Sequence, residues 1–184
     1  MNELPDKKYS IIYADPPWDY FSRWKRTDSD SSGMWGLSSQ HYNEMSVDDI
    51  KSLDVNSISN EDSFLFIWAT FPQIQEALDV IKAWGFEYKT VAFTWVKKSK
   101  NGNNSVGMGW YTRANAEVCL IARKGKIKAI NHTVRQVIES LREKHSKKPD
   151  EVRDRIVKLC GDIPRIELFA REKVEDWDSW GNEV

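Results

Sequence analysis

An apolar run stopped by two prolines sets the first constraint on how this chain can fold. Residues 9–14 (YSIIYA) have the length and apolar character of a buried strand, and Asp15-Pro16-Pro17-Trp18 follows directly. A proline has no N–H to donate to a strand ladder, so the strand must end there. We therefore expect a stiff, acidic turn at the carboxyl end of a buried strand.

The apolar segments that follow alternate between strand and helix patterns. Strands are predicted at 64–69, 88–96, 116–123 and 166–170, with a further short one at 127–130. Helices are predicted at 70–85, 133–144 and 149–161. This alternation predicts one α/β domain over residues 1–184, with a mostly parallel sheet, helices on both faces and an antiparallel pair at one edge. Ligands of such folds bind at the carboxyl ends of the strands, here after Ala14 and Ala170.

Composition narrows the class of protein. The longest apolar run, residues 64–69, is far shorter than the ~20 residues that a membrane-spanning helix needs. The polar, acidic N-terminus does not resemble a signal or transit peptide. Cys119 and Cys160 lie in apolar surroundings and are predicted to be buried thiols. We therefore expect a cytoplasmic protein without membrane contact.

Charge is distributed unevenly along the chain. The net charge is -1, yet residues 82–128 carry ten Lys or Arg against two Asp or Glu. A basic segment of this kind is typical of a nucleic-acid-binding surface, and equally of a solvated face that balances an acidic N-terminal third. Lys97, Lys98 and Lys100 are candidates for contacts with phosphate, or else belong to a solvated loop. No metal site is expected, because the three histidines, His41, His132 and His145, lie in separate segments and do not have the spacing of a ligand cluster.

The residues Asp15-Pro16-Pro17-Trp18 suit the methylation of an adenine amine. The lone pair of that nitrogen is delocalised into the ring, and a carboxylate and a backbone carbonyl that accept its two N–H groups favour the nucleophilic form. Proline supplies rigidity without a competing donor. An aromatic residue in the fourth position can stack on the base and orient it. The alternative is a double-proline turn that an unrelated aspartate and tryptophan happen to flank.

The chain also resembles the amino-methyltransferases with a DPPW signature, the family of the catalytic subunit of the eukaryotic mRNA adenosine methyltransferase and its bacterial and phage relatives. The resembling segments cover nearly the whole chain: 15–18, 42–45 (YNEM), 64–70 (FLFIWAT), 84–86, 107–110 (GMGW), 112–117 (TRANAE), 145–151 (HSKKPDE), 167–171 (ELFAR) and 180–183. The resemblance implies a Rossmann-like, S-adenosylmethionine-dependent methyltransferase fold in permuted order, with the catalytic loop first and the cofactor strand near the C-terminus.

For the cofactor, the resemblance implies residues at both ends of the chain. Asp15 would accept a hydrogen bond from the amino group of the cofactor or of the target, in a catalytic turn completed by Pro16, Pro17 and Trp18. Lys148 and Arg171 would pair with the methionine carboxylate. The remaining candidates are Glu167 and Asn182, with Glu183 as a further one, for the ribose hydroxyls, and Phe169 for the pocket wall. Taken singly, Lys148 is better explained as a solvated lysine, and Glu167 and Arg171 could form a commonplace strand-end ion pair; the surrounding motif favours the cofactor roles.

For the substrate, the resemblance implies that Tyr42 closes over the target base and that Arg113, Asn115 and Glu117 face the nucleic acid and the amine. The polar, Ser-rich stretch 20–40 is predicted to be a lid. A short chain without an accessory RNA-binding domain is more similar to the bacterial and phage relatives, so DNA is the expected substrate. RNA or nucleotides, and a catalytically silent nucleic-acid-binding subunit, are the alternatives. A homodimer is a further expectation.

Overall fold

The computed structural model describes residues 3–19, 44–107, 111–142 and 147–184. The predictions made for Tyr42 and for the lid at 20–40 lie outside these residues. In chain order the elements are β1 (Tyr9–Ala14), α1 (Val47–Ser52), β2 (Ser59–Ala69), α2 (Ile74–Ala83), β3 (Glu87–Lys98), β4 (Ala116–Lys124), β5 (Val137–Leu141), α3 (Glu151–Cys160), β6 (Arg165–Leu168) and β7 (Asp178–Trp180), with 3-10 turns at Val55–Ile58 and Phe71–Gln73.

The strands of the described residues form one sheet in the order β5-β3-β4-β2-β1-β6-β7. The pairs β1–β2, β1–β6, β6–β7 and β3–β5 are parallel, whereas β4 is antiparallel to both β2 and β3. The mostly parallel, Rossmann-like sheet is therefore confirmed. The antiparallel β3–β4 pair exists but does not form the edge, because β5 lies outside β3.

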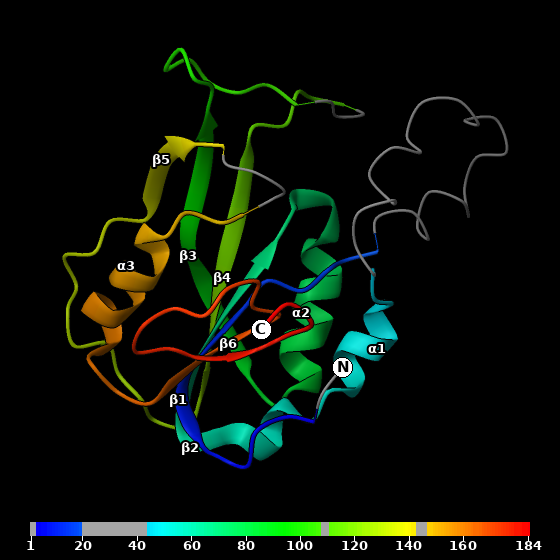
Figure 1. Cartoon of the computed structure of the whole chain (residues 1–184), viewed down its shortest axis with the longest axis vertical. Coiled ribbons are helices and arrows are strands. Elements are labelled where there is room, and N and C mark those ends of the chain that lie inside the picture. Colours follow the sequence, from blue (N-terminus) through cyan, green and yellow to red (C-terminus); the bar gives the residue numbers. More distant parts are fainter. Residues whose placement is uncertain (1–2, 20–43, 108–110, 143–146) are drawn as a thin grey trace, which may run out of the picture.

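Helices cover both faces of this sheet, as predicted, and each face has its own apolar core (Figure 1). The first core joins the sheet to α1 and α2 through buried residues that include Ile50, Val80 and Ile81. The second joins it to α3 through Val152 and Ile156. Cys119 and Cys160 are buried free thiols, as expected. Among the described residues, no helix has both the length and the apolar character needed to cross a membrane.

The helix boundaries follow local chemistry. Pro72 lies in the 3-10 turn that precedes α2, where its missing N–H costs little. Gly85 and Gly161 follow the ends of α2 and α3 with φ of 82° and 94°, a left-handed conformation that residues with a side chain adopt only with strain. These features confirm the predicted helices at 70–85 and 149–161.

Two predicted elements are wrong. The segment 133–144 does not begin a helix in the described residues, and its residues 137–141 form β5 against the outer edge of β3. The apolar residues are spaced for a helix, but β-branched neighbours next to an open parallel edge favour the strand. The predicted strand at 127–130 is instead irregular. Ile127 packs against the α3 core from a loop, and the N–H of Ile130 bonds to the carbonyl of Leu159.

One buried hydrogen bond connects the turn after β1 to β2, and a second connects β2 to β1. The indole N–H of Trp18 donates to the carbonyl of Trp68 at 3.0 Å, and the indole N–H of Trp68 donates to the hydroxyl of Tyr13 at 2.7 Å. All three side chains are buried. A buried polar group must be paired to be tolerated, so these bonds restrict the turn to one position relative to β1 and β2.

Replacing Tyr13 with Phe should test this connection. The change leaves the buried indole N–H of Trp68 without its acceptor, which should lower the free energy of unfolding by ~1–3 kcal/mol. Urea unfolding measures the loss. The matched control is Tyr88→Phe, since the side chain of Tyr88 is 41% exposed. Equal stability of the two variants would contradict the expected role of the Tyr13 hydroxyl.

Candidate active site

The carboxyl ends of β1 and β6 lie side by side. These strands are parallel neighbours, with Ala14 opposite Leu168. The turn at Asp15 and the loop at 169–171 therefore leave the same edge of the sheet. A pocket opens at this edge and is lined by Asp15, Pro16, Pro17, Trp18, Glu44, Trp68, Ala69, Thr70, Glu117, Lys148 and Arg171.

Acidic and basic side chains alternate across the pocket. The ammonium of Lys148 lies 2.8 Å from the Asp15 carboxylate and 3.3 Å from Glu117 Oε2. The other oxygen of Glu117 pairs closely with Lys97. Lys148 also lies over the ring of Trp68, 5.5 Å from its centroid. The side chain of Lys148 is only 11% exposed, so these charges interact in a partly dry setting, where pairing is stronger than in water.

The environment shifts the pKa values of two carboxyl groups in opposite directions. Burial by itself raises the pKa of Glu117, but the ammonium groups of Lys148 and Lys97 outweigh it and hold that pKa below its ordinary value. Glu44 has a raised pKa because it is partly buried and lies near Asp19. Glu117 is therefore a well-paired anion, whereas Glu44 is an acid that binds its proton more readily.

The turn after β1 is held by its own backbone. The N–H of Trp18 bonds to the carbonyl of Pro16, and the N–H of Met45 to that of Pro17, both at 2.9 Å. Each proline carbonyl keeps one lone pair for another donor. Trp18 lines the pocket, yet its side chain is only 3% exposed. In this conformation Trp18 packs in the core, and little of its ring is open for stacking on a base.

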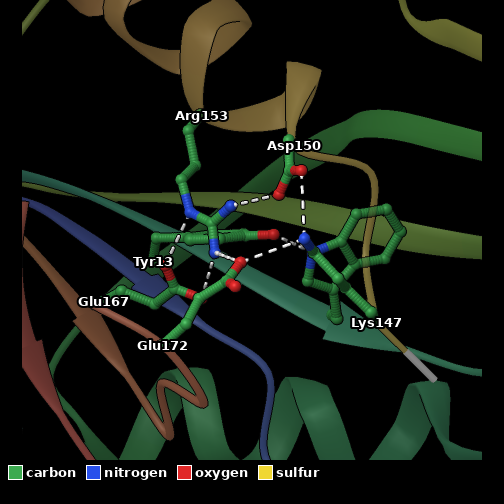
Figure 2. Close-up of polar contacts among 7 residues, drawn as sticks. Tyr13, Lys147, Asp150, Arg153, Glu167 and Glu172 are labelled. Atoms are coloured by element: carbon green, nitrogen blue, oxygen red, sulfur yellow. Dashed lines mark hydrogen bonds and ion pairs between the residues drawn. The ribbon is translucent and has the colours of Figure 1, made fainter. Parts of the chain in front are cut away.

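The residues expected to bind a cofactor fall into two groups. Lys148 and Arg171 line the pocket together with Asp15. Glu167, Phe169, Asn182 and Glu183 lie outside its lining, around the ends of β6 and β7. Phe169 has a φ of 61° and packs its ring edge-on against Trp180. The carboxylate of Glu167 forms two bonds with the guanidinium of Arg153, at 2.7 and 3.1 Å (Figure 2).

The residues expected to face a substrate are also dispersed. Glu117 lines the pocket, whereas Arg113 is exposed and Asn115 half-buried outside it. Among the lysines proposed for phosphate contacts, Lys97 is paired with Glu117, and Lys98 contacts Asn104 and Glu139. Lys97 is therefore engaged by Glu117, whereas Lys98, whose surface pair is weak, and the exposed Lys100 remain candidates for phosphate contacts.

The pocket suits a ligand that carries both signs of charge. Lys148 and Arg171 can neutralise a carboxylate, and Asp15 can accept a hydrogen bond from an amino group. The methionine part of S-adenosylmethionine has these groups, so the donor set fits this cofactor. Within the described part of the chain, no group of three or more His, Cys, Asp or Glu side chains could hold a metal ion.

Sequence reasoning missed several residues of the site. Thr70 follows β2 and lines the pocket, and the rule that sites form at carboxyl ends of parallel strands could have found it. Glu44 lies in one of the segments that resemble the family, but its pattern predicts no role in the site. For Trp68 the sequence predicts only a place in a buried strand. Arg153 gave no signal, because a basic residue in an amphipathic helix is ordinarily solvated.

This arrangement defines a class of protein. A mostly parallel sheet places an acidic, proline-stiffened turn beside one cationic residue from the loop before α3 and another from the loop after β6. This is the layout of a Rossmann-like methyltransferase. The chain belongs to the MT-A70 family, whose model matches residues 9–183.

Individual relatives support this assignment. The chain is 39% identical to the type II methyltransferase M.MunI of a Mycoplasma species, over 99% of this chain and 80% of that protein. It is 27% identical to the N(6)-adenosine-methyltransferase MT-A70-like protein of Drosophila melanogaster and 26% identical to the N(6)-adenosine-methyltransferase catalytic subunit METTL3 of Homo sapiens, in both cases over 96% of this chain. The alignments cover 27% and 28% of the fly and human proteins.

Glu117→Gln should reveal the charge pairing in the pocket. The variant leaves Lys97 and Lys148 with a neutral partner, and we expect a loss of ~1–3 kcal/mol of stability at neutral pH. Because the pKa of Glu117 is lowered on folding from 4.5, its stabilising effect is present above that pH and disappears as the pH falls through the folded-state pKa. The difference from the unmodified protein should therefore shrink in acid.

Thermal unfolding between pH 3 and pH 7 gives this comparison. Glu139→Gln is the control, because Glu139 pairs with Lys98 at the surface with its side chain 57% exposed; it should change stability little. A Glu117→Gln variant with the same stability difference at every pH would show that the charge of Glu117 contributes nothing.

Proposed function

We propose that this protein transfers the methyl group of S-adenosylmethionine to the exocyclic N6 amine of adenine in DNA. The observation that carries the proposal is the convergence of Asp15, Lys148 and Arg171 in one pocket at the edge where β1 and β6 end. The acid comes from the start of the chain and the two cations from its last quarter. Membership of the MT-A70 family supports the reaction type.

The mechanism follows from the chemistry of these side chains. The carboxylate of Asp15 accepts a hydrogen bond from the adenine amine, which localises the nitrogen lone pair and orients it. S-adenosylmethionine, when bound, would supply an electrophilic methyl group. The N–C bond would form as the S–C bond breaks, S-adenosylhomocysteine would leave and the methylated nitrogen would lose a proton to solvent, so no strong general base is required. Lys148 and Arg171 would hold the methionine carboxylate and neutralise its charge. The stiff turn keeps Asp15 in place. Its hydrogen bond to the amine therefore holds the amine in one orientation for reaction.

Lys148 links the two halves of the proposed reaction. Its ammonium contacts Asp15 and Glu117. If a carboxylate binds next to Lys148, the three N–H donors of the ammonium group are divided among Asp15, Glu117 and the new carboxylate. The pocket side of Asp15 then becomes available to the amine. Cofactor binding should for this reason precede or strengthen binding of the base.

DNA is favoured over RNA by the pattern of similarity. The chain is more similar to a type II methyltransferase than to relatives whose names specify adenosine, which is a ribonucleoside. The same reaction on RNA or nucleotides is the second candidate, supported by the adenosine-modifying relatives.

A reducing, cytoplasmic setting is also proposed, on the basis of the two buried, unbridged cysteines.

The substrate can be identified directly. Purified protein is incubated with methyl-labelled S-adenosylmethionine and, in parallel, with double-stranded DNA, single-stranded DNA, RNA and free nucleotides of mixed sequence. We expect label in DNA, at N6 of adenine after digestion and chromatography. Label confined to RNA or nucleotides would contradict the DNA assignment, and no transfer to any pool would contradict the reaction.

Asp15→Asn should abolish methyl transfer. An amide keeps the size of the side chain but loses the charge that favours the nucleophilic amine, so we expect at least a ~100-fold fall in kcat. Asp154→Asn, an exposed acid of α3, is the matched control and should behave as the unmodified protein. Circular dichroism checks that both fold. Full activity of Asp15→Asn would remove Asp15 from the mechanism.

Lys148→Ala should weaken cofactor binding by ~1.5–3 kcal/mol, the scale of a hydrogen bond to a charged group. Isothermal titration with S-adenosylmethionine measures the affinity. The control is Lys158→Ala, which removes an exposed lysine of α3. Unchanged affinity in Lys148→Ala would exclude Lys148 from the cofactor site.

A further inference from the structure

One guanidinium, that of Arg153 in α3, contacts three carboxylates from three segments (Figure 2). Its Nε and one terminal nitrogen lie 2.7 and 3.1 Å from the two oxygens of Glu167. The other terminal nitrogen lies 2.7 Å from Asp150, at the start of α3. Glu172, in the loop after β6, lies 4.0 Å away. The planar fork of arginine is suited to such bidentate contacts, which a lysine cannot reproduce.

The partner that most needs this contact is Glu167. It is a buried carboxylate with 7% of its surface exposed, on the same face of the sheet as Tyr13 of β1. The pKa of Glu167 is raised above its ordinary value: burial raises it most, Arg153 lowers it in part, and the nearby negative charges of Asp15 and Glu172 raise it. The cation of Arg153 is thus the main force that keeps the Glu167 carboxylate ionised, since an unpaired charge in such surroundings would take up a proton.

The same group of charges connects two loops that supply the pocket. Lys147 bridges Asp150 and Glu172, at 3.1 Å from each. The next residue after Lys147 is Lys148, and the residue before Glu172 is Arg171, and both line the pocket. Arg153 and Lys147 therefore hold the start of α3 against the loop after β6. This attachment lies next to both pocket cations in the chain.

We propose that Arg153 is a positioning residue of the cofactor site, which holds Glu167 as an oriented carboxylate for ligand hydroxyls. A carboxylate has about four lone-pair sites on its two oxygens. Arg153 occupies one on each oxygen, so each oxygen can still accept a hydroxyl. This inference rests on the proposed function, because it takes S-adenosylmethionine as the ligand.

The test measures the affinity for S-adenosylmethionine by isothermal titration between pH 6 and pH 9. In Arg153→Met the Glu167 carboxyl loses its cation and its pKa rises further, so a larger fraction of it is protonated at the acid end of this range than at the alkaline end. We expect binding weaker by about 10- to 100-fold at pH 6, with partial recovery at pH 9. Glu167→Gln should be equally weak at all pH values, and the double variant no weaker than Glu167→Gln.

Two further variants keep the result decisive. Arg153→Lys retains the charge and should fold, yet lose about 3- to 10-fold in affinity without a pH dependence, because a lysine cannot form both bonds. Lys158→Met, an exposed cation of the same helix, should bind as the unmodified protein does.

The outcomes separate the two proposals. If the unmodified protein does not bind S-adenosylmethionine, the proposed function fails. If it binds, and Arg153→Lys and every folded Arg153→Met sample bind equally well at all pH values, only the role of Arg153 fails. Additive losses in the double variant would also overturn it, since they would mean that Arg153 does not act through Glu167.

Discussion

The parallel pairing of β1 with β6 is the constraint on which the site depends. These strands are far apart in the chain, yet Ala14 lies opposite Leu168, and the segments that follow them leave the sheet at the same edge. An antiparallel pairing would have placed the acidic turn and the loop of Arg171 at opposite edges of the sheet, too far apart for a methyl group to pass between them. β1 tolerates this interior position because all of its residues except Ser10 are buried hydrophobic side chains.

Charge balance is the second requirement. The site gathers carboxylates at the ends of several strands, where burial disfavours ionised groups. Lys148 and Lys97 neutralise Asp15 and Glu117 on the pocket side, and Arg153 neutralises Glu167 toward α3. Each cation comes from an element other than that of the acid with which it pairs. The ion pairs therefore hold the elements together around the pocket, as well as keeping the acids charged.

The turn after β1 shows how rigidity and chemistry are combined. Its prolines end the strand, and their carbonyls accept backbone N–H groups from Trp18 and Met45. The indole of Trp18 reaches the carbonyl of Trp68, whose own indole reaches Tyr13. A residue that looked like a stacking platform in the sequence is thus also a buried anchor. This anchoring limits how far Asp15 can move and favours a preorganised position for the carboxylate.

The α/β class, most of the strands, the ends of α2 and α3, and the acidic turn can be predicted from the residues alone, because they depend on local features such as apolar period, proline and glycine. The segments that identify the family are also present in the sequence. That residues 137–141 form a strand follows from the folded structure, since the open edge of β3 outweighs a helical spacing. The tertiary structure alone paired Lys148 with Asp15, removed Lys97 from the candidate phosphate contacts and joined Arg153 to Glu167. Contacts between distant segments follow from strand order and burial, and no local pattern encodes them.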